Sequence, residues 1–475
     1  MGKTEPESLE RPRVSATGTR TSVRYVVLAA MCALAFIAYV QRVGFASAGI
    51  GLKDDIGLDE RQWSRVMAAF LIAYAGFEIP SGVLGDWFGA RNLLAVAALG
   101  WSAVTAALVV ILALPVFPTW EYAAMQFVVL LVLRFLFGMF QAGAFPGISR
   151  ILTDWMPVQE RGTAQGLIWT CSRLGGAVAP FLLGAWFFGF RGWQLAFILA
   201  ALLGVVWCAF VWPWLRNRPE DAPRVNRAEL AWIAGNRKAR SAGHGDVPWS
   251  RMLGSFSVWC LCLMYGFGGF TATFFITLLP NYLKQTRNLS SEEMQWLSGL
   301  PLAFGVLACL GGGLVSDTII RRTGNRKWGR RLSGLIGFTC AGMALLATNW
   351  VEHVWALGAL LCATFFFNDL SMGPAWASCA DIGERYAGTL GGAMNMIGNI
   401  GGACGALVAG ELFGREFVLQ IKDAGGVFNE FRLVGNELVF IVFACSFWFG
   451  AICWLGVDVT KRIDVGVFGI ANVND

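Results

Sequence analysis

Residues 128–146 read Val128-Val-Leu-Leu-Val-Leu-Arg134-Phe-Leu-Phe-Gly138-Met-Phe-Gln141-Ala-Gly-Ala-Phe-Pro146, an apolar run that is long enough to cross a membrane as a helix. Arg134 is its one charged residue, and Gln141 follows seven residues later, two helical turns along the same face. A charge at that depth costs about 3 kcal/mol or more, so Arg134 should face protein or a water-filled cavity. Either carbonyl groups hold the guanidinium for packing, or it binds an anion in a translocation path. We favour the anion-binding role.

The composition of the whole chain agrees with a membrane protein. Of its 475 residues, 56% are hydrophobic and 14% are charged, and the mean hydropathy is +0.57. An average soluble protein has about 45–50% apolar and about 25% charged residues, so this excess cannot be hidden in one globular core. Membrane β-barrels alternate in short runs, whereas the apolar runs here are long. The chain is therefore predicted to be an all-α polytopic membrane protein.

Charge, cysteine and histidine usage exclude several classes of function. The net charge of +6 does not indicate a nucleic-acid partner, because the basic residues lie between apolar runs on alternate sides, as membrane insertion requires. The twelve cysteines mostly fall inside apolar runs and show neither a CxxC pair nor metal-ligand spacing. His244 and His353 both fall in expected loops. We therefore expect no metal, no cofactor and no enzymatic nucleophile–base pair.

A window of about 20 residues predicts twelve membrane spans. They lie near 25–50, 63–84, 92–114, 121–149, 163–188, 193–215, 255–282, 294–316, 332–349, 354–380, 387–412 and 436–457.

The distribution of charge predicts the orientation of these spans. The stretch from Arg216 to Arg251 holds eight Lys or Arg against four Asp or Glu, and residues 317–331 hold six basic residues and one aspartate. Basic loops stay on the cytoplasmic side, so both termini and the central stretch are expected there. The predicted organisation is a cytoplasmic tail, a six-helix half, a cytoplasmic linker, a second six-helix half and a second tail. The boundaries are 1–24, 25–215, 216–254, 255–457 and 458–475.

The two halves resemble each other in sequence. Gly82 and Asp86 follow the second span of the first half with the same spacing as Gly313 and Asp317 in the second half. Internal duplication of six helices is typical of secondary transporters whose substrate site lies near the midplane between the repeats.

The loop Gly82-Val-Leu-Gly-Asp86-Trp-Phe-Gly89-Ala-Arg91 resembles the signature loop of the major facilitator superfamily. It departs from that signature at Trp87 and Ala90, where arginines are usual. The resemblance implies the major facilitator fold, twelve transmembrane helices in two pseudo-symmetric halves. It also implies that Asp86 and Asp317, with Arg91, gate the cytoplasmic side. The alternative to a gating role is that this loop is a simple turn whose charged side chains are solvated.

Further motifs narrow the resemblance to the anion:cation symporter family, which includes sugar-acid transporters of the galactonate, glucarate and hexuronate type. The motifs are Tyr39-Val-Gln41-Arg42-Val43, Ala69 to Gly82 with Tyr74 and Glu78-Ile-Pro80, Arg134 to Pro146, Asp154 to Pro157, Glu160-Arg161-Gly162, Leu279-Pro-Asn-Tyr-Leu283, Trp376 and Gly388 to Asn399. The implied function is transport of a small organic anion, a hexonate, hexuronate or aldarate, by alternating access. A bacterial inner membrane and a monomer in the lipid bilayer are expected.

The resemblance also implies which residues bind the substrate. A carboxylate needs a guanidinium, hydroxyl groups need tyrosine and amide partners, and a tryptophan face covers the C–H side of a polyol. Trp376 could equally be packing, and Arg173 could instead pair with a carboxylate of a neighbouring helix. The implied contacts are Tyr39, Arg42, Tyr74, Arg134, Gln141, Ser172, Arg173, Trp376 and Asn395.

Two departures bear on coupling to protons. The family usually has an aspartate where this chain has Gln41 and a glutamate where it has Gln141, and glutamine cannot titrate. Glu78 stands where similar proteins carry a glutamine, one helical turn after Tyr74, and Asp369 is the other clear mid-span acid. We hypothesise that Glu78 carries the coupling proton. Alternatively, Glu78 permanently neutralises a buried cation such as Arg173, and the protein is an uncoupled facilitator or exchanger. A sensor that binds without transport is a further alternative, although the linker is too short for an output domain.

Overall fold

The computed structural model describes residues 19–113, 122–179, 182, 193–234, 247–273, 275, 279, 291–412, 415–422 and 428–463. Within these residues, nine helical segments are long and apolar enough to cross a membrane, and one of them, Val354–Leu412, contains several consecutive helices. The described part of each of the twelve predicted spans is mainly helical, which confirms the all-α class. Several sequence predictions lie outside the described residues: most of both tails, His244, residues 280–283 of one motif, and the ends of the fifth and seventh spans.

The first half of the chain contains six spans, of which the fourth is interrupted. That span is built from α4 and α5, which are separated at Ala142 and Gly143. The helices are α1 (Val23–Asp55), α2 (Glu60–Phe88), α3 (Ala90–Ala113), α4 (Tyr122–Gln141), α5 (Ala144–Trp155), α6 (Arg161–Ala179) and α8 (Trp193–Val211), with a 3-10 turn at Val158–Glu160.

The second half repeats this pattern, including the interruption. Its fourth span is built from α15 and α16, which are separated at Leu370 and Ser371. The helices are α11 (Phe256–Thr273), α13 (Ser291–Thr323), α14 (Arg326–Ala347), α15 (Val354–Asp369), α16 (Met372–Gly383), α17 (Ala387–Leu412) and α18 (Gly435–Gly456), with 3-10 turns at Thr348–Trp350 and Glu384–Tyr386. Between the halves lie a 3-10 turn at Pro219–Asp221 and the short helices α9 (Arg227–Ala234) and α10 (Trp249–Gly254).

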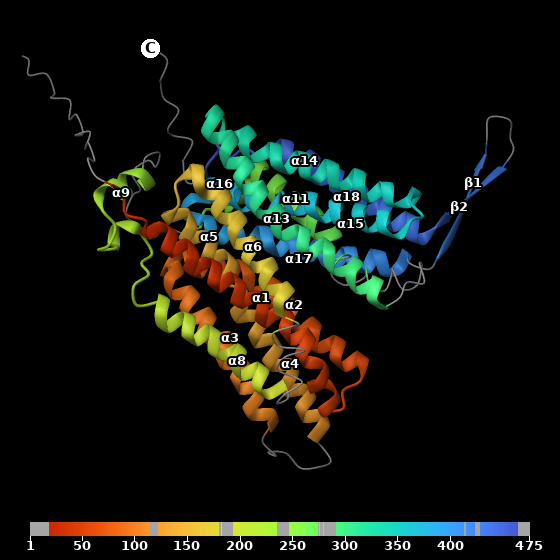
Figure 1. The fold of residues 1–475 in the computed structure, drawn as a ribbon, viewed down its shortest axis with the longest axis horizontal. Coiled ribbons are helices and arrows are strands. Elements are labelled where there is room, and N and C mark those ends of the chain that lie inside the picture. The colour runs from red at the N-terminus through yellow and green to blue at the C-terminus, as the bar shows by residue number, and fades with distance from the viewer. Residues whose placement is uncertain are drawn as a thin grey trace, which may run out of the picture.

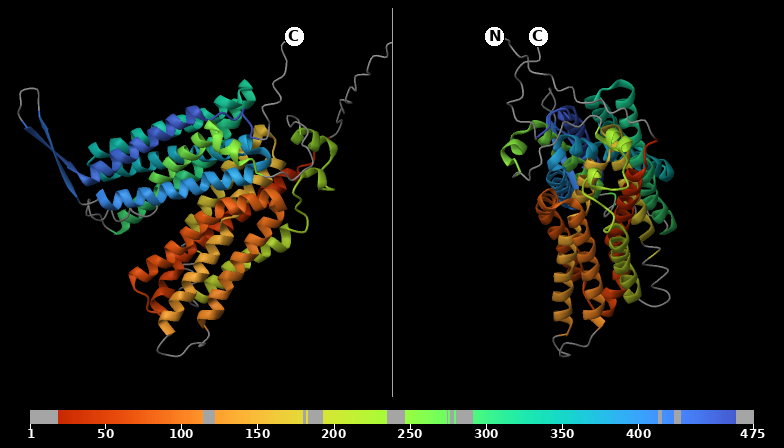
Figure 2. Two further views of the ribbon diagram at one scale, coloured as in Figure 1. Left: turned by 180° about the vertical axis from the view of Figure 1, so that it is seen from behind. Right: turned by 90° about the vertical axis from the view of Figure 1, so that its left-hand side faces the viewer.

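The two halves meet at one end of the molecule and diverge toward the other. Figure 1 shows the red-to-yellow helices of the first half and the green-to-blue helices of the second half converging near α5, α16 and α9, and Figure 2 shows the same V-shaped arrangement from behind. Arg24 at the start of α1 pairs with Glu229 of α9 at 3.1 Å. We call this the linker end, and the opposite end the open end.

Small residues allow the helices to pack closely. A Cβ added to Gly138 of α4 would lie 2.4 Å from the carbonyl oxygen of Phe70 in α2, and one added to Gly175 of α6 would lie 2.5 Å from that of Phe36 in α1. Such distances mean that the backbones touch, as is typical of membrane helices that associate without a hydrophobic driving force. Glycine is therefore required where these spans cross.

A β-hairpin that the sequence analysis did not predict joins α17 to α18. Strand β1 (Glu416–Lys422) pairs antiparallel with β2 (Phe428–Val434), in a register that runs from Glu416 opposite Val434 to Lys422 opposite Phe428. Figure 1 shows this hairpin projecting away from the helices at the open end. The span-based prediction missed it because it tested only for apolar runs of membrane-crossing length.

Candidate functional site

Arg42 and Gln141 form a hydrogen-bonded pair between α1 and the end of α4. The Arg42 Nε donates to Gln141 Oε1 at 2.8 Å, and Gln141 Nε2 donates to the Ala38 carbonyl at 3.0 Å. The Arg42 guanidinium also lies 4.1 Å from the ring centroid of Tyr74. Gln141 is fully buried, and the interruption after α4 places it at a helix end. The amide thus orients a half-buried cation without neutralising it.

Glu78 of α2 contacts the other half of the molecule. Its carboxylate accepts hydrogen bonds from Asn395 Nδ2 and from Asn399 Nδ2, the latter at 3.2 Å to each oxygen. Asn395 also donates to the Tyr74 hydroxyl at 3.2 Å. Glu78 is 0% exposed, and no described lysine or arginine nitrogen lies within ion-pair distance of it. Two asparagines of α17 therefore hold this carboxylate across the interface.

Arg173 and Asp369 form a bidentate ion pair between α6 and α15. The Arg173 Nε and Nη2 lie 2.8 and 3.0 Å from the two carboxylate oxygens, and Asn368 Nδ2 donates to Asp369 at 3.0 Å. Fork-to-fork geometry of this kind is the strongest arrangement available to such a pair. Of the two roles left open for Arg173, the structure thus places it on a carboxylate of a neighbouring helix. That carboxylate is not Glu78.

Trp376 belongs to a cluster of aromatic rings between the halves. Its Nε1 donates to the Tyr265 hydroxyl at 3.1 Å, and its ring lies 5.8 Å from Trp169 and 6.2 Å from Phe145. Trp169 stacks on Phe145, and Tyr39 lies edge-on to both rings. Trp376 is 1% exposed, so in this conformation it packs against aromatic partners from both halves.

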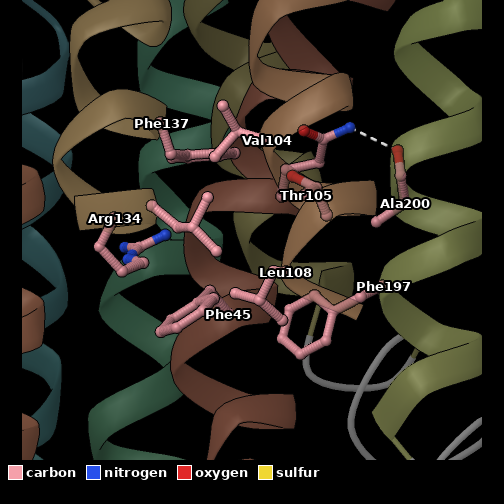
Figure 3. A pocket seen from close by; sticks show the side chains of 10 residues that line it. Phe45, Val104, Thr105, Leu108, Arg134, Phe137, Phe197 and Ala200 are labelled. Atoms are coloured by element: carbon pink, nitrogen blue, oxygen red, sulfur yellow. Dashed lines mark hydrogen bonds between the residues drawn. The ribbon is translucent and has the colours of Figure 1, made fainter. Parts of the chain in front are cut away.

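The structure does not bring Arg134 into contact with Arg42, Gln141 or Asn395. Its guanidinium lies 3.8 Å from the ring centroid of Phe45 and beside a small cavity of about 20 Å³. Figure 3 shows Arg134 and Phe45 among the residues that line this cavity. Within the described part of the chain, Arg134 Nε is buried without a hydrogen-bond partner. The cavity is lined by Gln41, Phe45, Val104, Thr105, Leu108, Leu133, Arg134, Phe137, Phe197 and Ala200.

In the described structure, no hydrogen bond joins Ser172 to Arg42, Gln141, Tyr74 or Asn395. Its hydroxyl donates to the Ile168 carbonyl of its own helix at 2.9 Å. The residue is fully buried, so its one donor is satisfied within α6. The family resemblance implied a polar contact with the substrate, whereas here the Ser172 hydroxyl bonds to the backbone of its own helix.

Asp86 connects the two halves at the linker end. Its carboxylate accepts from the backbone N–H groups of Gly388 and Thr389 at 3.2 and 2.7 Å and from the Thr389 hydroxyl at 2.7 Å. Arg150 Nε lies 3.2 Å from the same carboxylate. The unsatisfied N–H groups at the start of a helix favour a negative charge, and here that helix is α17 of the other half.

Asp317 of the second half makes the corresponding contacts with the first half. It accepts from the N–H groups of Gly162 and Thr163 at 3.1 and 2.6 Å and from the Thr163 hydroxyl at 2.7 Å, at the start of α6. Arg330 Nη1 lies 2.7 Å from it. We call Asp86, Asp317 and the two Gly-Thr pairs the latch. Each aspartate is thus bound to the opposite half, which a solvated turn would not be.

Glycines allow the latch to close. A Cβ on Gly82 would lie 2.3 Å from the Gly388 carbonyl oxygen, and one on Gly313 would lie 2.2 Å from that of Gly162. Each glycine precedes its aspartate by one helical turn on the same helix face. Close backbone approach therefore brings each carboxylate to the helix start that it binds.

A second set of charges supports the latch. Arg161 Nη1 and Arg330 Nε lie 2.7 and 3.1 Å from the two oxygens of Asp381, and Arg330 Nη2 donates to the Val158 carbonyl across the interface at 2.9 Å. Both arginines are fully buried. Arg91, which the sequence placed with the gate, instead donates to the Trp212 carbonyl of its own half at 3.1 and 2.9 Å.

Sequence reasoning missed several of these residues, although signals for some were present. Asn399 lies one helical turn after Asn395, so both amides occupy one face of α17. Gly162-Thr163 and Gly388-Thr389 are a further internal repeat at corresponding positions of the two halves. No local pattern indicated Tyr265 or Trp169 in particular among the 36 Phe, 21 Trp and 7 Tyr residues.

Comparison with known proteins gives the relatives of this chain. The family model of the Major Facilitator Superfamily matches residues 31–406. The chain is 32% identical over 397 residues to the Probable sulfoacetate transporter SauU of Cupriavidus necator, covering 83% of this chain and 89% of the relative. It is 30% identical over 413 residues to the Probable galactarate/D-glucarate transporter GudP of Escherichia coli, covering 84% and 89%.

Solved structures agree on the fold. The proton:xylose symporter XylE, bound to 6-bromo-6-deoxy-D-glucose, matches with a TM-score of 0.68 at 12% identity, covering 93% of this chain and 97% of the other. A bacterial homologue of the iron transporter ferroportin in an outward-facing state matches with a TM-score of 0.67 at 13% identity, covering 92% and 100%.

Proposed function

This chain belongs to the Major Facilitator Superfamily, and we propose that it carries a small organic anion, a sugar acid or a similarly short acid, across a membrane by alternating access. It is a transporter and not an enzyme, as its relatives and fold show. Relatives at 30% and 32% identity are named for galactarate or glucarate and for sulfoacetate, all organic anions. These names support the class of substrate proposed here.

The observation that carries the proposal is the polar group around Arg42, which consists of Arg42, Gln141, Tyr74 and Asn395. A half-buried guanidinium is oriented by Gln141 and lies against Tyr74, whose hydroxyl is bound by Asn395 of the other half. A guanidinium with free N–H groups can hold a carboxylate bidentately, and the tyrosine and asparagine supply partners for hydroxyl groups. Because the group draws on both α2 and α17, a bound anion would contact both halves.

The latch gives a physical basis for alternating access. It holds the halves together at the linker end while they diverge at the open end. Release of substrate at the linker end requires those cross-half bonds to break and the halves to close at the open end instead. We place the linker end in the cytoplasm, because basic residues are concentrated there. In this assignment the conformation described here opens outward.

Glu78 is the proposed coupling group. Its carboxylate is bound by two amides of the opposite half, so protonation would change interactions that cross the interface. Neither Gln41 nor Gln141 can take a proton, and Asp369 is engaged by Arg173. The alternative of an uncoupled facilitator remains in the proposal, although in this conformation Arg173 does not require Glu78 as its counter-charge.

Uptake into proteoliposomes tests the proposed function. Purified protein is reconstituted and offered labelled galactonate, glucarate, glucuronate and sulfoacetate, with protein-free liposomes as the control. Accumulation or counterflow of at least one of these anions is expected. Binding of an anion without any uptake or exchange would identify a sensor instead, and neutral sugars transported in preference to all four acids would contradict the proposal.

A further inference from the structure

The middle of the spans contains unequal numbers of positive and negative charges that are buried or half-buried. Among the described residues there, Arg42, Arg134 and Arg173 are cationic, and Glu78 and Asp369 are acidic. Arg173 and Asp369 neutralise each other through two short contacts. Two guanidinium groups therefore remain against one carboxylate, and that carboxylate is held by asparagines rather than by either arginine.

Neither remaining arginine has a carboxylate partner within the described part of the chain. Arg42 contacts the amide of Gln141. Arg134 lies over the rings of Phe45, Phe70 and Phe137, at 3.8, 4.8 and 5.1 Å from their centroids. Aromatic faces offset only part of the free-energy cost of burying a cation.

Both arginines also present unused hydrogen-bond donors. Arg42 Nη2 and Arg134 Nε are buried with no partner among the described atoms, and Arg134 is 3% exposed. Buried donors of this kind are rare, and each calls for a specific explanation. The oxygens of an anion supply both the missing acceptors and the missing negative charge.

The two guanidinium groups are close enough to act on one small molecule. Both lie against the ring of Phe70, with Arg42 Cζ 5.2 Å and Arg134 Cζ 4.8 Å from its centroid. The sum of these distances limits their separation to about 10 Å. Unscreened charges at such distances interact strongly in a medium of low dielectric constant.

We propose that the site selects a dianion, a short dicarboxylate or sulfonate-carboxylate, over a monoanion with the same carbon skeleton. This inference rests on the proposed function and names its substrate class. One anionic group binds Arg42, and the second lies toward Arg134 and balances it. With Glu78 carrying the proposed coupling proton, a monoanion leaves one of the two guanidinium groups without a counter-charge, so its binding is weaker. Gln41 and Gln141 are the specificity-determining residues, because a carboxylate at either position would cancel one of the two cations.

Two matched pairs of anions test the proposal by competition binding to the purified wild-type protein. Glucarate and gluconate differ by one terminal carboxylate, as do sulfoacetate and isethionate, which replaces that carboxylate with a hydroxymethyl group. We expect the dianion of at least one pair to bind tenfold or more tightly than its monoanion. Gln141→Glu and Gln41→Glu should each reduce this ratio to below half of the wild-type value, because each adds one fixed negative charge beside an arginine.

Gln62→Glu is the matched control for these variants. Gln62 lies in the first turn of α2, where it forms a capping box with Asp59, and glutamate serves the same role there. The ratio is measured on one preparation of each variant, so loss of folded protein does not change it. Equal or tighter binding of the monoanion in both pairs would overturn the proposal, as would a ratio that both glutamate variants leave unchanged. If no organic acid binds at all, the proposed function fails instead.

Discussion

At the scale of the residue, the proposed site depends on arginines that have no carboxylate partner in the described part of the chain. Arg42 keeps its position through Gln141 and Tyr74, so its charge is available to a ligand. Arg173, whose charge Asp369 cancels, is an internal comparison within the same molecule. Whether a buried guanidinium recognises substrate or only joins two helices is therefore decided by its partner.

Arg42→Ala should weaken binding of the transported anion by roughly tenfold or more, because a hydrogen bond to a charged group contributes about 1.5–3 kcal/mol. Arg42→Lys should recover only part of the affinity, since lysine cannot make the bidentate contact. Equilibrium binding to purified protein measures both effects. Unchanged affinity in Arg42→Ala would remove this residue from the site.

Arg134→Ala should also abolish high-affinity binding while leaving expression and monodispersity close to those of the wild type. The charge has no carboxylate partner that its removal would leave unpaired in the described structure. Size-exclusion profiles and binding are measured on the same preparation. If the variant binds at wild-type affinity, Arg134 serves packing rather than recognition.

Glu78→Gln should abolish accumulation driven by an inward proton gradient and preserve substrate exchange. Glutamine can still interact with Asn395 and Asn399 but cannot carry a proton. Proteoliposomes with and without a pH gradient separate the two activities, and Glu352→Gln, an exposed residue, is the control. If the wild type never concentrates its substrate under such a gradient, the coupling hypothesis is wrong.

At the scale of the element, the structure depends on reciprocal helix capping. The aspartate that ends the second span of each half binds the first N–H groups of the fifth span of the other half. This contact combines hydrogen bonding with the helix dipole, and it joins the two halves at the linker end in the conformation described here. In the proposed alternating access, the same interaction stabilises this conformation and must break before the linker end can open.

Asp86→Asn should slow transport several-fold while changing equilibrium binding much less. The substitution keeps an acceptor but removes the charge that favours the start of α17. Transport rate and affinity are compared in the same proteoliposome preparation, with Asp221→Asn on the exposed linker as the control. Parallel loss of binding and transport would indicate misfolding rather than a defect of the latch.

At the scale of the whole molecule, the duplicated halves meet at the linker end and diverge at the open end, and the proposed mechanism moves them as two bodies. Their helix interruptions, glycines and aspartates recur at corresponding positions. Arg42 and Tyr74 of the first half and Asn395 of the second half form the proposed site, so a ligand bound there would favour the approach of the two halves at the open end. Such a ligand shifts the conformational equilibrium by its difference in affinity for the two states.

Spin labels on the two halves measure this movement. Asp59 and Glu352 are exposed residues in loops at the open end, and Arg218 and Arg322 are exposed at the linker end. In a Cys404→Ser background, a saturating concentration of a transported anion should shorten the distance between labels at Asp59 and Glu352, because in the proposed mechanism both halves contact the ligand. Unchanged distances for both pairs in the presence of a transported anion would contradict the two-body mechanism.

The sequence by itself determined the membrane class, the twelve spans and the duplication, because each depends on local composition and spacing. A run of about 20 apolar residues is helical in lipid whatever surrounds it, since its backbone must satisfy its own hydrogen bonds. Gly82 with Asp86 and Gly313 with Asp317 could be matched for the same reason. The β-hairpin escaped prediction because it lies outside any apolar run of that length.

Only the tertiary structure decided which charges are paired. Nothing local distinguishes Arg173 from Arg134, yet α15 brings a carboxylate to the first and three rings surround the second. Likewise, Arg91 follows Asp86 closely in sequence but binds Trp212 of its own half. Pairing depends on helices that are distant in sequence, and a buried charge takes its role from whatever the packing places beside it.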